Sequence, residues 1–337
     1  MTSLLDLELV FVTGKGGVGK TTVAAALAEV AARRGQRVLV CEMDAKGALA
    51  TAFEVSQLEF EPTEVEPGLH AMSMNTEDAL QEYLRLFVKI PFIGRIGPLA
   101  STLDFVADAA PGVKEILAIG KLAWEVKERH YDLVVVDAEA SGHVVSQIGA
   151  PKVIADLVQV GVVKDQTQWM LDILEDPQRT GVAVVTTSEE MPVTESIELL
   201  ERLTNETGTY PVAVIANRVL VDVFDDEERA VATRVPEAMN VLADAIGNGV
   251  RAVVDAAMIV ESRRSIGDAH LDRLAEAIGA LDLSSATRGR TSAELPIVTV
   301  PEMFSRSHGK RVVSLVADVL DRSLDASTDT DADGIED

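Results

Sequence analysis

The chain has 337 residues, of which 47% are hydrophobic, and its formal net charge is -25. A chain of this length can bury one large core or two small ones, and so negative a surface repels nucleic-acid phosphate and anionic lipid headgroups. Its single cysteine, Cys41, excludes an intrachain disulfide, a four-cysteine zinc site and an iron–sulfur cluster that needs two cysteines per chain.

The sequence carries no sign of a membrane or export segment. It has no run of about 18 apolar residues, and residues 1–12 carry acids in place of the basic start of an export signal. We therefore expect a cytoplasmic protein that does not insert into a membrane and does not bind nucleic acid.

Apolar runs along the chain predict strands, and the stretches between them predict helices. The run at 7–13 is stopped by glycines, a helix is predicted at 20–34, and a second strand follows at 37–44. Further strands are predicted at 131–137, 180–187, 210–219 and 297–301. Continuous apolar strands separated by helices are typical of a parallel sheet that is covered on both faces.

Two helical stretches, at roughly 76–130 and 144–176, are too long to be simple crossovers. We expect them to form a helical subdomain inserted on one side of the sheet, within a single domain at 1–322. The acidic stretch 323–337 lacks aromatic residues and is predicted to be a disordered tail. The predicted fold class is α/β, with a mostly parallel, doubly wound sheet and an inserted helical subdomain.

A glycine-rich segment, GKGGVGKT at 14–21, lies between the first predicted strand and helix and fits the phosphate-loop pattern. Such a loop wraps a β-phosphate with backbone N–H groups, while Lys20 reaches the β and γ oxygens and Thr21 ligates Mg²⁺. Thr22 is placed for the α-phosphate. The segment predicts a P-loop NTPase that binds ATP and Mg²⁺ through Gly14, Gly16, Gly17, Val18, Gly19, Lys20, Thr21 and Thr22.

Lys15, directly after the first glycine, marks the deviant Walker A subgroup of phosphate loops. In that subgroup the lysine reaches across a dimer interface to the partner's phosphates, in the manner of an arginine finger. Because the chain has one such loop, we expect a dimer with Lys15 as a catalytic residue. The dimer is either a homodimer or a heterodimer with a related ATPase subunit.

Two aspartates end predicted strands on the side where the phosphate loop lies. Asp137 has the usual position of the acid that holds the Mg²⁺ water shell, with a loop cap as the alternative. Asp44 is the candidate for orienting the attacking water, with the N-cap of a helix at 45–53 as the alternative. Gly142 is placed to offer a backbone N–H to the γ-phosphate.

These motifs resemble those of the arsenite-pump and tail-anchored-protein targeting ATPases. The resemblance rests on DAKGALATAF at 44–53, DAEASGH at 137–143, APGVKE at 110–115, TTSEEMPVTES at 186–196, VIANRV around Asn217 and VPEMF at 300–304. It implies that Asn217 reads adenine and that the loop carrying Pro301 and Glu302 covers the base.

Both switch segments depart from the family's pattern. Ala45 and Gly47 replace a proline and a histidine in the first, and Glu139 and Ala140 replace an alanine and a proline in the second. The resemblance implies a dimeric switch that hydrolyses ATP and acts through its helical subdomain. A catalytically weak regulatory subunit of a paired complex is one alternative. A partitioning or positioning ATPase is the other, although DNA and membrane partners suit a basic chain.

The helical stretches contain enough apolar residues for a groove that takes a hydrophobic helix of a client protein. The residues are Leu84, Leu86, Phe87, Val88, Ile90, Phe92, Ile93, Ile96, Leu99, Leu103, Phe105 and Val106. An ordinary core explains them equally well, so both interpretations stay open. Cys41 alone cannot supply the soft ligands that an arsenite site needs.

Overall fold

The computed structural model describes residues 4–88, 112–157, 162–222, 224–247, 249–281, 295–304 and 308–329. Its strands, in chain order, are β1 (Leu9–Gly14), β2 (Val38–Glu42), β3 (Thr63–Glu66), β4 (Leu69–Ser73), β5 (Leu133–Ala140), β6 (Thr180–Thr186), β7 (Pro211–Val219) and β8 (Ile297–Pro301). They form one sheet in the order β3-β4-β2-β5-β1-β6-β7-β8, and only the β3–β4 pair among these described strands is antiparallel. The predicted α/β fold with a mostly parallel sheet is confirmed.

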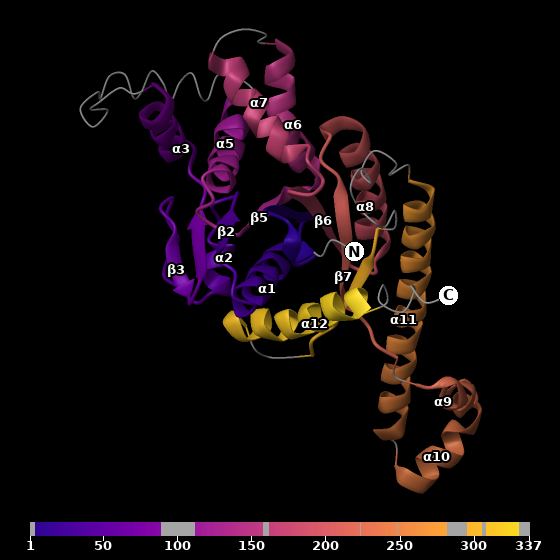
Figure 1. Cartoon of the computed structure of the whole chain (residues 1–337). Coiled ribbons are helices and arrows are strands. Elements are labelled where there is room, and N and C mark those ends of the chain that lie inside the picture. The colour runs from indigo at the N-terminus through magenta and orange to yellow at the C-terminus, as the bar shows by residue number, and fades with distance from the viewer. Residues whose placement is uncertain are drawn as a thin grey trace, which may run out of the picture.

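Helices lie on both faces of the sheet (Figure 1). The longer ones are α1 (Lys20–Arg33), α3 (Thr76–Tyr83), α5 (Val113–Lys127), α6 (Ser141–Leu157), α7 (Val162–Leu174), α8 (Glu190–Arg202), α11 (Gly249–Ala280) and α12 (Lys310–Asp329). The shorter ones are η1 (Leu4–Asp6), α2 (Ala48–Ala52), η2 (Leu84–Val88), η4 (Leu203–Thr207), α9 (Asp226–Ala232), η5 (Val235–Ala238) and α10 (Met239–Ile246).

Two hydrophobic cores lie on opposite faces of the sheet. In β1, Val10 and Val12 belong to the core covered by α1 and α12, whereas Leu9 and Phe11 belong to the core covered by α5, α6 and α8. Alternate side chains of a strand point to opposite faces, so a strand between two helical layers is apolar at every position. This explains why the core strands read as continuous apolar runs.

The structure adds an edge that the apolar runs did not predict. β3 has the sequence TEVE, and its side chains are exposed or half-buried because it lies at the end of the sheet. Its partner β4 is buried and pairs with β2 on its other side. An edge strand covered on few sides needs no apolar run, which removes the signal used to find the other strands.

Helices α3, α5, α6 and α7 pack together as the predicted helical subdomain on the face of the sheet opposite α1 and α12 (Figure 1). The two predicted stretches, 76–130 and 144–176, both contain helices as expected. Residues 89–111, which include the apolar positions from Ile90 to Val106, lie outside the described residues.

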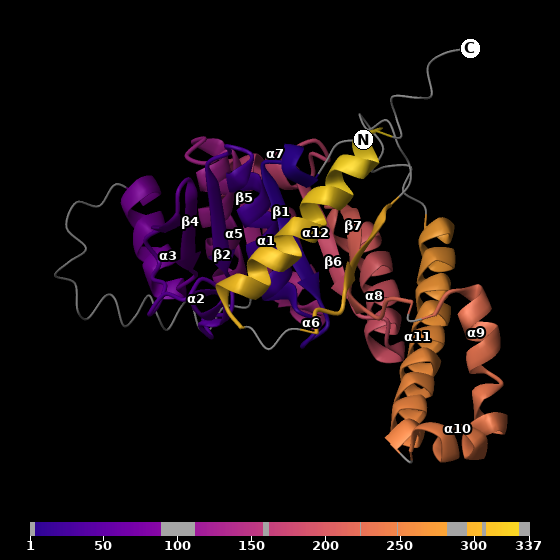
Figure 2. The same ribbon diagram turned by 90° about the horizontal axis from the view of Figure 1, so that it is seen from below.

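Helices α9, α10 and α11 form an arm that projects away from the sheet (Figures 1 and 2). The sequence patterns did not indicate these helices. The C-terminal part of α11 packs on α8, and Gly267 comes so close to the preceding loop that an added Cβ would lie 2.8 Å from Ser188 Oγ. Leu274 and Ile278 anchor the same part of α11 in the core. The N-terminal part of α11 extends past the body of the protein.

Helix α12 lies across α1 (Figure 2). Arg33 and Arg34, at the end of α1, form ion pairs with Asp318 and Asp321 of α12. The predicted tail at 323–337 begins too early, because the helix continues to Asp329 and buries Leu324 against α1's face of the sheet. Residues 330–337 lie outside the described residues. Within the described ranges, no helix has the length and apolar character to cross a bilayer.

Candidate functional site

The glycine-rich loop joins β1 to α1 and depends on its glycines. Gly14 has φ +147°, and a Cβ there would lie 2.0 Å from the carbonyl oxygen of Val185 in the neighbouring strand β6. Gly19 has φ +95°, and a Cβ there would lie 2.4 Å from Asn217 Nδ2. Only glycine tolerates both the left-handed backbone and these close approaches. The loop therefore keeps its backbone amides near the start of α1, where an anion is favoured.

Lys20, Thr21 and Asp137 converge at the first turn of α1. Asp137 lies in β5 and pairs in register with Val12 of β1, which brings it beside the loop. Thr21 Oγ1 donates a hydrogen bond of 2.6 Å to Asp137 Oδ2. Lys20 Nζ donates to the carbonyl oxygen of Lys15 at 3.3 Å. Asp137 does not end its strand, since β5 continues to Ala140, so the alternative role as a loop cap fails.

Burial has the largest effect on the pKa values of Asp137 and Lys20. It raises the pKa of Asp137 to about 6, against the lowering by the Thr21 hydrogen bond and the Lys20 charge. Burial also lowers the pKa of Lys20, and Asp137 opposes that shift. The second carboxylate oxygen, Asp137 Oδ1, is buried without a hydrogen-bond partner among the described residues. An unused carboxylate oxygen beside a threonine hydroxyl suits a hard cation such as Mg²⁺, so the residues fit the expected metal.

Lys15 does not point free into solvent. It forms an ion pair with Glu195 of α8. The other carboxylate oxygen of Glu195 accepts a hydrogen bond of 3.2 Å from Ser141 Oγ, at the first residue of α6. Glu195 thus connects the glycine-rich loop to the second switch segment. It was not among the predicted site residues, although it lies in the segment TTSEEMPVTES.

Asp44 lies just beyond β2, exposed and ion-paired with Lys46. The alternative role of Asp44 as a helix N-cap is wrong, because α2 begins at Ala48 and has Gly47 as its N-cap. Glu42 serves α2 instead, since its Oε1 accepts a hydrogen bond of 2.8 Å from the Ala48 amide. Glu42 pairs in register with Asp137, so a third acid lies close to the site.

The second switch segment leads directly into helix α6. Gly142 lies in the first turn of α6, whose backbone amides have no partner within the helix. Glu139 is held at both ends, because its carbonyl accepts from Thr13 Oγ1 at 2.9 Å and its carboxylate accepts from Gln147 Nε2 at 2.7 Å. Glu139, one of the two replaced residues of the second switch segment, therefore contacts both β1 and α6.

A cavity of about 670 Å³ flanks the loop on the side of β7 and α11. Its lining includes Lys15, Gly16, Gly17, Val18, Arg218, Glu302, Phe304 and, from α11, Arg263, Ile266 and His270. Of the predicted base-binding residues, Glu302 lines the cavity, and Asn217 and Pro301 are not among its described lining residues. The α11 residues carry no motif and lie far from the loop in sequence, so nothing pointed to them.

Asn217 contacts the loop itself. Its side chain is buried, Nδ2 donates to the Val18 carbonyl at 2.8 Å, and Oδ1 accepts from the Arg218 amide at 3.0 Å. The Nδ2 bond fixes the loop against β7, and the bond to the neighbouring Arg218 amide holds the Asn217 side chain in place. The Arg218 backbone has the left-handed φ of +56°, and its side chain is exposed and lines the cavity.

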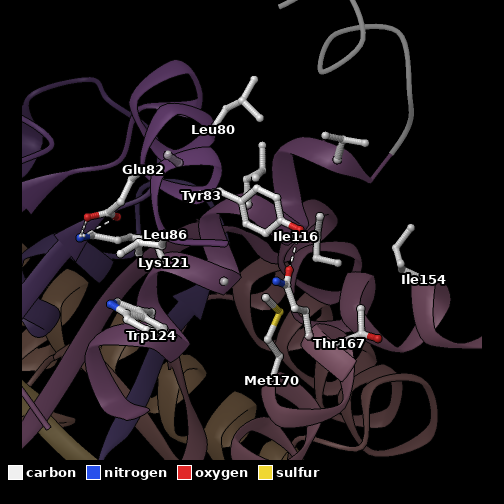
Figure 3. Close-up of a pocket in the computed structure, with 15 residues that line it drawn as sticks. Leu80, Glu82, Tyr83, Leu86, Ile116, Lys121, Trp124, Ile154, Thr167 and Met170 are labelled. Carbon is white, nitrogen blue, oxygen red and sulfur yellow. Dashed lines mark hydrogen bonds and ion pairs between the residues drawn. The ribbon is translucent and has the colours of Figure 1, made fainter. Parts of the chain in front are cut away.

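A second cavity, of about 340 Å³, lies inside the helical subdomain (Figure 3). Most of its lining is apolar and comes from Ala79, Leu80, Leu86, Val113, Ile116, Leu117, Trp124, Ile154 and Met170. Its polar lining groups are already engaged. Tyr83 donates to Gln166 Oε1 at 2.5 Å, and Lys121 is ion-paired with Glu82 and Glu125. The charged and polar groups of the lining named above therefore already have partners within the protein, and the apolar lining suits an apolar ligand.

Comparison with known proteins agrees with the motifs. The sequence profile of the anion-transporting ATPase family matches residues 7–165 and 158–278. The chain is 33% identical over 227 residues to ATPase BagA of Mycobacterium tuberculosis, covering 64% of this chain and 66% of BagA. It is 30% identical over 150 residues to ATPase ASNA1 homolog 1 of Paramecium tetraurelia, covering 44% of each chain. These alignments span less than two thirds of each relative. Since the profile covers well over half of its residues, the chain belongs to the anion-transporting ATPase family.

Proposed function

We propose that the chain is a Mg²⁺-dependent ATPase that works as a dimeric switch. The observation that carries this proposal is the meeting of Lys20, Thr21 and Asp137 at a loop that only glycines can form. Membership of a family described as anion-transporting ATPases supports it. The relatives named above also have ATPase in their names.

The residues divide the chemistry among them. The backbone amides of the loop bind phosphate, Lys20 neutralises the β and γ oxygens, and Thr22 serves the α-phosphate. Thr21 and Asp137 hold Mg²⁺, which neutralises phosphate charge when it is bound. The buried, partner-free Oδ1 of Asp137 supports this assignment. Asp44 orients the attacking water, and the Gly142 amide binds the γ-phosphate from the start of α6.

The nucleoside lies in the 670 Å³ cavity beside the loop. Arg218, Glu302 and Phe304 line that cavity, and Phe304 offers an exposed ring on which a base can stack. Pro301 positions the loop that bears Glu302 and Phe304. Asn217 acts on adenine through the loop that it holds, because its amide is already bonded to Val18 and Arg218.

The dimer completes each site with Lys15 of the partner. Lys15 lines the cavity and is held by a half-buried ion pair with Glu195, which a partner's phosphates can replace. The partner is a second copy or a related ATPase subunit. While Lys15 stays paired with Glu195 of its own chain, its charge is not available to a phosphate group.

Helix α6 connects the nucleotide to the helical subdomain. It begins at Ser141, next to the phosphate side, and carries Ile154, which lines the 340 Å³ cavity (Figure 3). A shift of α6 on nucleotide binding therefore changes the cavity wall. The apolar lining supports a hydrophobic protein segment as the client of this subdomain.

A catalytically weak regulatory subunit is a second candidate. It is favoured by the ion pair between Asp44 and Lys46, which neutralises the acid that would orient water. In that case ATP binding and dimerisation persist while turnover is slow.

Binding and turnover measurements separate the two candidates. We expect the chain to bind MgATP and hydrolyse it, and Asp44→Asn to keep binding while lowering turnover at least about tenfold. Lys20→Ala should lose binding, because it removes the charge that meets the β and γ oxygens. A chain that binds MgATP but turns over no faster than Asp44→Asn is a regulatory subunit. Absence of MgATP and MgADP binding in calorimetry overturns both.

Intrinsic fluorescence tests the coupling to the helical subdomain. The chain has two tryptophans, and Trp124 and Trp169 both lie there with ring centroids 6.4 Å apart. Trp124 also lines the 340 Å³ cavity (Figure 3). MgATP should change the emission of the parent chain and leave that of Lys20→Ala unchanged. An emission spectrum that does not respond to bound MgATP contradicts the coupling.

A further inference from the structure

The arm exposes large apolar side chains. Val231, Val241, Ile246, Val253, Ile259 and Ile266 are each between 56% and 72% exposed. Single exposed apolar residues are common on monomeric proteins. Six of them on three neighbouring helices indicate a surface that binds another molecule.

Part of this surface is a regular seam along α11. Ala252, Ala256, Ile259, Arg263, Ile266 and His270 follow one another at alternating steps of four and three. That spacing places them on one face of the helix, as at the contact positions of a coiled coil. Five of the six are exposed and His270 is half-buried, so the described residues leave this face largely uncovered.

The other faces of α11 are already used. Gly267, Leu274 and Ile278 face the body of the protein. Arg264 and Glu261 face the arm, where Glu261 is ion-paired with Arg229 of α9. The seam borders the first of these surfaces, because the next position of the same spacing, Arg273, donates hydrogen bonds to Thr194 Oγ1 and to the Glu190 carbonyl of α8. Its N-terminal part, at 252–266, continues this side of α11 beyond the body of the protein.

The seam begins at the nucleotide side of the molecule. Arg263, Ile266 and His270 line the same cavity as Lys15 and the glycine-rich loop. A partner that receives Lys15 must approach this side. The seam is therefore continuous with the interface of the proposed dimer.

We propose that the seam packs against the same seam of a second copy of this chain, antiparallel, with the two-fold axis at Ile259. This inference rests on the proposed dimeric function and names its packing surface. In this register Ile259 meets the other Ile259, the large Ile266 meets the small Ala252, and Arg263 meets Asp255. Such a contact is isologous and closes after two copies.

Charge selects the antiparallel arrangement. Arg263 and Asp255 are both exposed, and neither has an ion-pair partner among the described residues. In a parallel pairing, each Arg263 would face the other Arg263 at a contact position. The antiparallel register replaces this repulsion with two opposite-charge pairs, which matters for two copies of net charge -25.

The geometry also fits two facing nucleotide sites. Ile266 lies seven residues from the axis, which is about 10 Å along an α-helix. The two cavities then lie on opposite sides of the axis, and each projecting arm reaches along the partner's body. Ile259 and Ile266, which the arm exposes in one chain, become buried in the dimer.

Cysteine cross-linking of the full chain tests the register. Ile259→Cys, oxidised with MgATP present, should give a disulfide-linked dimer, because the two thiols meet at the axis. Ile266→Cys alone should not, since its two copies are roughly 20 Å apart along the seam, and Ile266→Cys combined with Ala252→Cys should link. Val241→Cys, at a position on α10 that is more exposed than Ile259, and the parent chain, whose single Cys41 is fully buried, are the controls.

Charge exchange gives an independent measurement. Arg263→Glu and Asp255→Arg should each weaken MgATP-dependent dimerisation several-fold in analytical ultracentrifugation. The double variant should restore it, because the opposite charges face each other again. Failure of the double variant to recover overturns the antiparallel register.

The outcomes distinguish this inference from the proposed function. If the parent chain dimerises with MgATP but Ile259→Cys does not link, the seam is wrong and the dimeric switch stands. Linking by Ile266→Cys alone indicates a parallel packing, and equal linking by Val241→Cys indicates random collision; either result overturns the proposal. A parent chain that stays monomeric with MgATP overturns both the seam and the dimer.

Discussion

Asp137 is a buried acid whose surroundings disfavour its charge. Burial raises its pKa from an ordinary value of 3.8 to about 6, although Thr21 and Lys20 stabilise the carboxylate. In the unfolded chain the same group ionises at its ordinary pKa. Its charge therefore costs stability at every pH above about 6, and the cost disappears as the pH falls toward the unfolded value.

Asp137→Asn should stabilise the nucleotide-free protein at pH 7.5, by up to about 3 kcal/mol in the free energy of unfolding. The neutral amide keeps an oxygen for the Thr21 hydroxyl and removes the buried charge. The gain should shrink between pH 6 and pH 4, as the parent's Asp137 becomes protonated. Urea unfolding in EDTA at several pH values measures it. A gain that grows as the pH falls contradicts the pKa shift.

Glu195 holds Lys15 within its own chain and so competes with a partner's phosphates. Glu195→Gln removes the ion pair but keeps a group that can bond to Ser141. We expect this variant to dimerise at several-fold lower MgATP concentration than the parent. Glu198→Gln, on the exposed side of the same helix, is the matched control. In a Lys15→Ala background, Glu195→Gln should have no effect, and an undiminished effect there rules out the competition.

At the scale of elements, α12 holds to α1 by two kinds of contact. Leu320 is 1% exposed in the core, whereas Asp321 makes a half-exposed ion pair with Arg34. Truncating a buried leucine leaves a cavity and costs about 2–5 kcal/mol, while an exposed pair contributes about 0–1 kcal/mol.

Leu320→Ala should therefore lower the free energy of unfolding by about 2–5 kcal/mol, and Asp321→Ala by less than about 1 kcal/mol. Chemical denaturation at moderate salt measures both variants. A larger loss for Asp321→Ala would mean that the ion pairs, and not the apolar face of α12, keep this helix on α1.

The elements also show which features sequence patterns reveal. The six predicted strands are confirmed, because each crosses both cores and is apolar at consecutive positions. β3 escaped prediction, since an edge strand with the sequence TEVE needs no apolar run. The arm was not predicted either, because its helices carry no strand-like apolar run and none of the motifs used to find the site.

The site follows the same division. The loop, Lys20 and Thr21 are adjacent in sequence, so local spacing was enough to bring them together. Asp137 is 116 residues from Thr21, but it follows an apolar strand run that pairs with β1, so its place beside the loop could be predicted. Glu195 and the α11 residues reach the loop only through tertiary packing, across long separations in sequence and without a motif. The role of Asn217 in fixing the loop depends on the contact between β7 and the loop, which spacing does not reveal.

At the scale of the whole molecule, the net charge of -25 opposes the association of two copies. Screening shortens the reach of this repulsion to about 8 Å at physiological ionic strength. MgATP-dependent dimerisation should therefore strengthen several-fold between 20 and 200 mM NaCl, as measured by sedimentation. An interface dominated by attraction between opposite charges would show the reverse trend, and that result would exclude repulsion as the main long-range effect.

The packing of α12 on α1 also sets an order of events during synthesis. Arg33 and its partner Asp318 are 285 residues apart in sequence. Helix α1 is synthesised early, and its outer face stays uncovered until α12 leaves the ribosome much later. Until then, apolar side chains meant for α12 remain uncovered on the nascent chain. A chain that terminates before α12 should thus be an aggregation-prone fragment that binds chaperones, and not a smaller active enzyme.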